Sequence, residues 1–313
     1  MQRIGFVVSN QFQMMSLSVL SVFELANDEA QSAVYDLEIL SESGGTVVSS
    51  WGVPLGTTAL KDYDYDTLLV SGIGLTKPTP GVTAYLKAAY HEVRRIGSIC
   101  RGAFILAEAG LLDGRRATTH WGFASTLAQR YPQVLVEADR IFIVDGSIWT
   151  SAGMSAGIDM GLAMVEKDLG IDIARSVAKR LVVYHRRAGG QSQYSALLDI
   201  SPKTDRLQAA LNFASSNLTQ PLSVEQLAEV ANLSPRQFSR QFRTETGKSP
   251  AKAVEQLRVE AARLMIEQGH HALEIVARET GFGDRERMRR AFLRNYGQSP
   301  QMIRRTFGPS ISA

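Results

Sequence analysis

The C-terminal third of the chain contains an internal repeat, which constrains the fold more than any other feature of the sequence. LAEVANLSPRQFSRQFRTETGKSP (227–250) is echoed by VARETGFGDRERMRRAFLRNYGQSP (276–300). The copies align at an offset of 49 residues through the first half and 50 through the second, as if the second copy had one extra residue in a turn. The segment therefore contains two similar supersecondary units.

Each copy has the pattern of a helix, a tight turn and a second helix. Ser223 and Ser234 are candidate N-caps for the two helices of the first copy. Helical periodicity separates apolar positions from polar ones in both second helices. The side chains predicted to face inward are those of Leu233, Phe238, Phe242, Phe282, Met288 and Phe292.

The opposite faces of the second helices are polar and mostly basic. A basic second helix supported by an apolar first helix fits the helix-turn-helix motif, which reads the major groove of DNA. The residues expected to contact DNA are Arg236, Gln237, Ser239, Arg240 and Arg243 in the first copy and Glu286, Arg287, Arg289 and Arg290 in the second. Residues 250–269 predict a long amphipathic helix that holds the two readers at a fixed spacing.

Charge also distinguishes this region from the rest of the chain. Residues 205–313 contain 16 Lys and Arg against 11 Asp and Glu, whereas residues 1–204 contain 18 against 20. The basic surplus indicates a polyanionic partner for the C-terminal region. Charge alone leaves open the alternative of a helical domain with a merely solvated surface.

The C-terminal region resembles the DNA-binding domain of AraC/XylS-family transcription regulators. The matching residues are Arg258, Ala262 and Met265 in the long helix, then Leu273–Phe282, FLRNYGQSP (292–300) and Arg304. Met265 and Met288 stand where the family usually has Leu and Phe. The resemblance implies sequence-specific binding to double-stranded promoter or operator DNA.

The first 190 residues alternate strand-like and helix-like segments. RIGFVV (3–8), LLVSG (68–72) and IGSIC (96–100) are apolar runs of the buried-strand type, and helix-like segments separate them. The alternation predicts an α/β fold for this region, with a doubly wound parallel sheet and helices on both faces. Together with the C-terminal repeat, the predicted architecture is this α/β domain followed by an all-α C-terminal domain with two helix-turn-helix motifs. Ligands of such sheets bind beyond the carboxyl ends of the strands.

Cys100 is the only cysteine, and it lies between a strand-like and a helix-like segment. A residue at such a turn is displayed at the edge of the sheet, and the helix dipole together with Arg101 is expected to favour its thiolate. The arrangement resembles the intracellular-peptidase-type branch of the class I glutamine amidotransferase-like superfamily. Cys100 and His120 match the cysteine and histidine of that branch, and residues 150–166 and 186–195 extend the resemblance.

Active members of that branch commonly carry a carboxylate near the cysteine. Ser16 occupies the aligned position here, and residues 1–23 contain no Asp or Glu. A pair without its acidic neighbour is weak evidence for turnover. We therefore interpret Cys100 and His120 as a vestigial pair in a sensor pocket, and we do not expect an enzyme.

The ligand pocket is expected at the carboxyl edge of the sheet. Its predicted lining residues are Asn10, Gly74, Cys100, Arg101, His120 and Trp121. Arg101 suits a carboxylate and Trp121 suits a cation, so the expected effector is a small metabolite such as an amino acid or related amine. Three alternatives stay open: a cysteine hydrolase or amidase that uses Cys100 and His120, a structural buried cysteine, and an architectural DNA-binding protein without an effector.

The expected domain layout is a ligand-sensing domain over 1–190, a linker over 191–204 and a DNA-binding domain over 205–308. The partners expected are double-stranded DNA, a small-molecule effector and a second copy of the chain in a homodimer. The chain shows no signal-peptide pattern, so we expect a cytoplasmic protein without a membrane segment. The remaining histidines, His91, His185, His270 and His271, lack metal-ligand spacing, and we expect neither a metal nor a cofactor.

Overall fold

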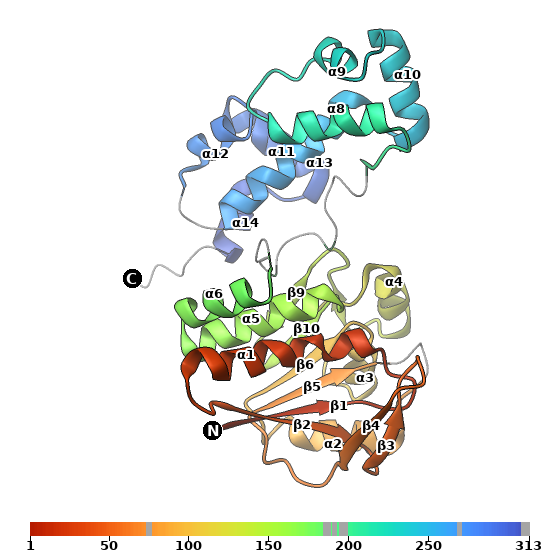
Figure 1. Cartoon of the computed structure of the whole chain (residues 1–313), viewed down its shortest axis with the longest axis vertical. Helices are drawn as coiled ribbons and strands as arrows, with labels where there is room; N and C mark the ends of the chain where they lie inside the picture. The colour runs from red at the N-terminus through yellow and green to blue at the C-terminus, as the bar shows by residue number, and fades with distance from the viewer. Residues whose placement is uncertain (73–76, 184–188, 190–192, 194–199, 268–270, 308–313) are drawn as a thin grey trace. The chain divides into compact units, whose positions relative to one another are not determined.

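The computed structural model describes residues 1–72, 77–183, 189, 193, 200–267 and 271–307. The chain forms two compact units, Met1–Gln193 and Tyr194–Ala313, and each is described by itself (Figure 1). Gln193 therefore belongs to the first unit, three residues beyond the predicted end of that domain. Most of the predicted linker 191–204, like Gly74, lies outside the described residues.

An eight-stranded sheet in the order β3-β4-β2-β1-β5-β6-β10-β9 forms the centre of the first unit. Its strands are β1 (Gln2–Val7), β2 (Tyr35–Ser41), β3 (Gly45–Val48), β4 (Pro54–Ala59), β5 (Thr67–Ser71), β6 (Arg95–Ile99), β9 (Phe142–Asp145) and β10 (Ile148–Ser151). The six strands from β4 to β10 pair in parallel, as the sequence predicts. The edge pairs β3–β4 and β9–β10 are antiparallel, which was not predicted. Each edge pair is joined by a short turn, and such a turn permits only antiparallel pairing.

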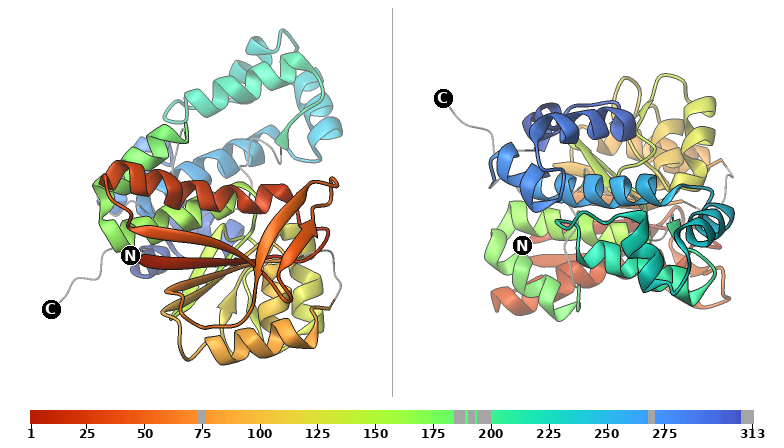
Figure 2. Two further views of the ribbon diagram at one scale, coloured as in Figure 1. Left: turned by 60° about the horizontal axis from the view of Figure 1, so that its bottom comes forward. Right: turned by 90° about the horizontal axis from the view of Figure 1, so that it is seen from above.

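Helices cover both faces of this sheet, so the doubly wound prediction is confirmed. One face packs against the 3-10 helix η1 (Met14–Val19) and helices α1 (Leu20–Ala30), α5 (Ser155–Leu169) and α6 (Ile171–Arg180). The other packs against α2 (Pro80–Ala89), α3 (Gly102–Glu108) and α4 (Trp121–Arg130). Figure 2 shows α1 and α2 on opposite sides of the strands. A small parallel pair, β7 (Arg116–Ala117) with β8 (Leu135–Val136), lies outside the main sheet.

The second unit is helical and has two cores. Its helices are α8 (Asp205–Ser216), α9 (Val224–Val230), α10 (Pro235–Thr246), α11 (Pro250–Glu267), α12 (Leu273–Glu279), α13 (Arg285–Tyr296) and α14 (Pro300–Phe307). Helix α11 contributes Leu257 to the first core and Ala262 to the second. One continuous helix therefore connects the two helix-turn-helix motifs, as predicted. Of the six side chains predicted to face inward, five are buried and Leu233 is partly buried.

The extra residue of the second repeat lies in its turn. Residues 231–234 separate α9 from α10, whereas residues 280–284 separate α12 from α13. Within the longer turn, Gly281 has a φ of +78°, and a Cβ placed there would lie 1.8 Å from the Leu218 carbonyl oxygen. The same oxygen accepts a hydrogen bond from Arg258 Nε at 3.0 Å. The turn of the second motif is therefore packed directly against the segment that follows α8.

We expect Gly281→Ala to lower the free energy of unfolding of the helical unit by about 2–4 kcal/mol, because the methyl group would collide with backbone and the residue is left-handed. Gly297→Ala is the matched control, since Gly297 has a φ of +66° but open space around it. Its cost should be only about 1 kcal/mol of backbone strain. Urea denaturation of the full-length protein, followed by circular dichroism, measures both. Equal losses would contradict the packing role of Gly281.

Candidate functional site

Helix α10 presents arginines to solvent and two phenylalanines to the core. Phe238 and Phe242 are buried, and Arg236, Arg240 and Arg243 are exposed while Ser239 is half-buried. These three arginines form no ion pair with any residue that the structure describes. Their guanidinium groups are therefore available to phosphates or base edges.

Gln237, also a predicted DNA contact, takes part in capping α10. Its Oε1 accepts a hydrogen bond from the Ser234 N–H at 3.2 Å, and Ser234 Oγ accepts one from the Gln237 N–H at 3.3 Å. This capping box fixes the start of the helix and confirms Ser234 as its N-cap. The side-chain oxygen of Gln237 is thereby committed to the helix end.

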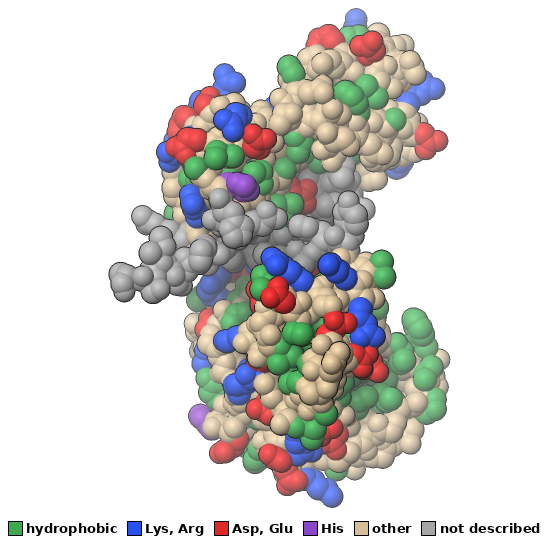
Figure 3. All heavy atoms as spheres, turned by 60° about the vertical axis from the view of Figure 1, so that its left-hand side comes forward, with side chains coloured by type: hydrophobic (Ala, Val, Ile, Leu, Met, Phe, Trp, Pro, Cys, Tyr) green, Lys and Arg blue, Asp and Glu red, His purple; other side chains and the backbone are tan. Residues whose placement is uncertain are grey.

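Helix α13 presents its arginines in pairs with carboxylates. Arg289 donates two hydrogen bonds to Glu286, at 2.7 and 2.8 Å, and these bonds hold the pKa of Glu286 below its usual range. Arg290 Nε lies 3.6 Å from the same carboxylate, and Arg287 pairs with Asp284 at 3.3 Å. Figure 3 shows basic and acidic side chains interspersed on the visible face of the helical unit. These three arginines therefore have carboxylate partners, unlike those of α10.

Cys100 lies at the predicted turn between β6 and α3, and it is enclosed by backbone. Its φ is +54° and it is only 5% exposed. A Cβ on Gly153 would lie 2.0 Å from Cys100 Cβ, and one on Gly72 would lie 2.3 Å from the Arg101 carbonyl oxygen. Glycines on both sides therefore allow the chain to approach the turn closely.

The expectation of a thiolate at Cys100 is wrong. Burial raises the pKa of the thiol, and this effect outweighs the hydrogen bond from the Arg101 backbone and the Arg101 charge, both of which lower it. Ser16, at the position of the missing carboxylate, is buried in η1. The thiol is therefore protonated at neutral pH, and a protonated thiol is a poor nucleophile.

His120 acts as the N-cap of α4. Its Nδ1 accepts a hydrogen bond from the Gly122 N–H at 3.2 Å, and burial together with the Arg101 charge lowers its pKa. The neighbouring Thr119 hydroxyl donates to the Cys100 carbonyl oxygen at 2.8 Å. The hydrogen bonds recorded for the described residues do not connect Cys100 with His120. The two residues are close in the fold, but they do not form an activated pair.

The other predicted lining residues near this turn form an aromatic and basic cluster. The Arg101 guanidinium lies 5.2 Å from the centre of the Phe123 ring, and its buried Nε has no partner among the described residues. Trp121 is 59% exposed, with its ring 5.4 Å from that of His120. Trp121 thus lies at the surface rather than in a core, whereas Arg101 is partly buried.

The Gln193 side chain forms hydrogen bonds to the backbone beside this cluster, and Gln193 was not among the predicted site residues. Its Nε2 donates to the carbonyl oxygens of Thr119 at 2.7 Å and Arg140 at 3.1 Å, and its Oε1 accepts the Trp121 N–H at 2.7 Å. Gln193 lies within the segment 186–195 that carries the family resemblance, but nothing in its residue type or spacing indicates these hydrogen bonds. The last residue of the first unit is thus bonded to the segment that carries His120.

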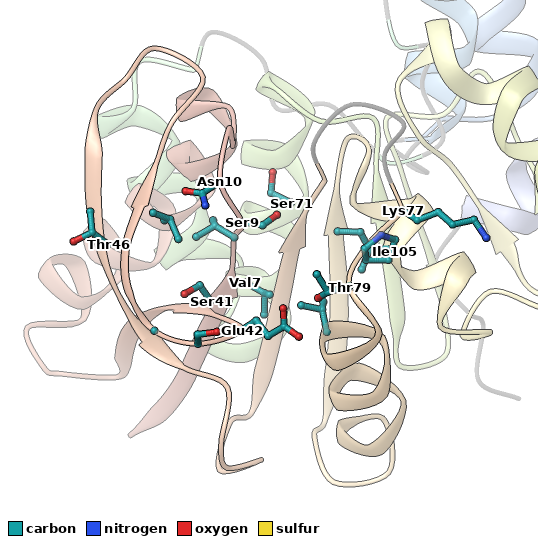
Figure 4. A pocket seen from close by; sticks show the side chains of 16 residues that line it. Val7, Ser9, Asn10, Ser41, Glu42, Thr46, Ser71, Lys77, Thr79 and Ile105 are labelled. Atoms are coloured by element: carbon teal, nitrogen blue, oxygen red, sulfur yellow. The ribbon is translucent and has the colours of Figure 1, made fainter.

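A cavity of about 420 Å³ opens at the carboxyl ends of β1, β2 and β5 (Figure 4). Asn10 lines it, whereas Cys100, Arg101, His120 and Trp121 are not among its lining residues. Its floor is formed by Val7, Val8, Ser41, Val47, Ser71, Val82 and Ile105, and its rim by Ser9, Asn10, Glu42, Ser43, Gly44, Thr46, Lys77, Pro78 and Thr79. Because most of the rim comes from irregular segments, no periodicity in the sequence marks it.

The described residues show neither a metal site nor a membrane-spanning helix. These residues contain no group of three His, Cys, Asp or Glu side chains placed to hold a metal ion. The described helices also include none that is long and apolar enough to cross a membrane.

Comparison with known proteins agrees with this geometry. Residues 2–167 match the model of the DJ-1/PfpI family, and residues 227–306 match a helix-turn-helix domain. The chain is 32% identical to the HTH-type transcriptional regulator GlxA of Rhizobium meliloti, over 98% of this chain and 97% of that protein. The chain belongs to the DJ-1/PfpI family. Within it, the chain is a DNA-binding transcriptional regulator with an AraC-type helix-turn-helix domain.

Other matches of this regulator agree with that assignment. The crystal structure of an AraC family transcriptional regulator from Pseudomonas putida superposes with a TM-score of 0.53 at 26% identity, covering 58% of this chain and all of that one. Isonitrile hydratase of Pseudomonas putida is 32% identical, but over only 43% of this chain and 60% of that enzyme. The likeness to this enzyme covers less than half of the chain, whereas the likeness to the regulator GlxA covers nearly all of it, so the matches support a regulator rather than an enzyme.

Iodoacetamide should alkylate the native protein slowly at neutral pH and faster as the pH rises, because the raised pKa and burial of Cys100 keep the thiolate scarce. Since the chain has one cysteine, mass spectrometry of the intact protein reports this residue alone. The same protein unfolded in urea is the control and should react faster. Alkylation at neutral pH as fast as in urea would contradict a protonated, enclosed thiol.

Proposed function

We propose that the N-terminal unit of this regulator binds a small-molecule effector at the carboxyl edge of its sheet, and that binding changes transcription through the helical unit. The observation that supports this proposal is the cavity of about 420 Å³, which lies in the same chain as two helix-turn-helix motifs. Cavities of this size suit small metabolites. Arg101 and its aromatic neighbours provide a second, basic surface at this edge.

A hydrolytic function is the weaker alternative. Catalysis by Cys100 would need a thiolate and a histidine base, yet the thiol pKa is raised and His120 Nδ1 is used in a helix cap. An enclosed cysteine with these neighbours suits a structural or sensing role. An architectural protein without an effector would have no use for the cavity.

We further propose that the regulator acts as a homodimer in the cytoplasm, where the DNA is. Symmetric dimers are the commonest assemblies of soluble proteins, and a pair of chains would present four reading helices to a long operator. Sedimentation of the full-length protein, with and without operator DNA, tests the dimer.

Arg240→Ala should weaken operator binding by about tenfold to a hundredfold, because its guanidinium carries no competing carboxylate and base-edge contacts are strong. Arg290→Ala should weaken it less, since Arg290 lies 3.6 Å from Glu286. Binding to random DNA should fall less than operator binding in both variants. Footprint titrations on the operator measure these affinities.

Arg175→Ala is the control for the loss of one exposed positive charge, because Arg175 lies on α6 in the first unit. It should bind the operator as the unmodified protein does. Unchanged footprints for both Arg240→Ala and Arg290→Ala would refute the assignment of α10 and α13 as the readers.

A further inference from the structure

We infer that the cavity at the carboxyl ends of β1, β2 and β5 binds the primary ammonium group of a small aliphatic amine, with Glu42 as its counter-ion. Only the consequence for transcription rests on the proposed function, since binding can be measured by itself.

The cavity lies where the winding of the sheet reverses. The chain leaves β1 towards η1 and α1 on one face and leaves β5 towards α2 on the other, so the connections diverge above these two strands. Crevices at such a reversal are the usual ligand sites of open α/β sheets. This site is separate from the turn that holds Cys100, which follows the next strand, β6.

The cavity has an excess of negative charge. Among its described lining residues only Glu42 and Lys77 are charged, and Lys77 Nζ pairs with Glu108 at 3.0 Å. Figure 4 shows the Lys77 side chain extending away from the cavity, whereas Glu42 lies between the end of β2 and Thr79. No ion pair links Glu42 to another described residue. A cationic group is the ligand that this charge favours.

The neutral lining suits a hydrogen-bonding cation on a short chain. Ser9 and Thr79 line the cavity, and their hydroxyl groups can accept hydrogen bonds from N–H donors. Asn10 Oδ1 already accepts the Val48 N–H at 3.0 Å, so its amide nitrogen is left to donate to a polar group on the ligand. The apolar floor, which includes Ile105, suits methylene groups.

A second observation points to an unfilled polar site. Ser71, at the end of β5, lines the cavity and is 1% exposed, yet its Oγ has no hydrogen-bond partner among the described residues. Buried hydroxyls almost always have a partner. A polar ligand group, or a water held by it, would supply one.

The absence of aromatic rings distinguishes a primary from a quaternary ammonium. Quaternary ammonium groups cannot donate N–H bonds and are recognised by aromatic cages. The described lining contains no Phe, Tyr or Trp. The lining can therefore accept hydrogen bonds from a primary ammonium group, but it has no aromatic face to bind a trimethylated nitrogen.

Isothermal titration of the full-length protein tests this inference. The probes are ethanolamine, aminobutanol and aminohexanol, each paired with its N-trimethylated counterpart and with the corresponding diol. We expect at least one primary amine to bind, and its trimethylated and uncharged counterparts to bind at least about tenfold more weakly, because a charge-assisted hydrogen bond is lost.

Variants assign the binding to the cavity. Glu42→Gln keeps the shape but removes the charge, and it should weaken the amine by about tenfold to a hundredfold. Glu92→Gln is the matched control, an exposed carboxylate that precedes β6 and so lies at the opposite edge of the sheet. It should leave affinity unchanged. Lys77→Gln should leave affinity unchanged or raise it, because that charge is turned away.

Three results would overturn the inference: no primary amine bound up to about 10 mM, an equal affinity for a trimethylated counterpart, or full affinity in Glu42→Gln. A promoter reporter separates this outcome from the proposed function. If an amine binds through Glu42 but does not change transcription from the reporter, the binding site is supported and the effector role of the amine is refuted. A reporter response to another metabolite that survives Glu42→Gln, with no amine bound in the titrations, would preserve the effector role while the titrations refute this site.

Discussion

The pairing of β1 with parallel neighbours on both sides is the constraint on which the N-terminal unit depends. Strand β1 contacts β2 through one edge and β5 through the other, and the connections that follow β1 and β5 leave towards opposite faces of the sheet. The carboxyl ends of these strands are therefore not covered by a common connection. The cavity, the turn at Cys100 and the cluster around Arg101 all lie along this one edge.

Close backbone packing explains why the cysteine turn is retained without an activated thiol. Gly72 and Gly153 bring neighbouring segments so near to the turn that Cys100 is almost fully buried, and burial raises its pKa. His120 serves the start of α4 instead of the thiol. The turn is instead part of a tightly packed edge of the sheet, and Gln193 hydrogen-bonds the neighbouring segment through the carbonyl oxygens of Thr119 and Arg140.

The helical unit depends in a similar way on one shared element. Helix α11 contributes side chains to both cores, so the two readers are held by a single rigid helix. The readers differ in electrostatics, because the arginines of α10 are free of carboxylates among the described residues while those of α13 are paired with Glu286 and Asp284. In the function that we propose, the arginines of α10 contact DNA without losing an ion pair, whereas those of α13 have carboxylate partners that compete with DNA.

The sequence by itself determined the local elements and their order. Periodicity and caps predicted the helices that bury Phe238 and Phe292, and apolar runs predicted the parallel strands and the turn at Cys100, because these signals depend on neighbours along the chain. Only the tertiary structure decided the protonation of Cys100, the role of Gln193 and the cavity beside Glu42. Each of these depends on burial and charge supplied by segments far apart in sequence, and the pattern of a single segment does not record them.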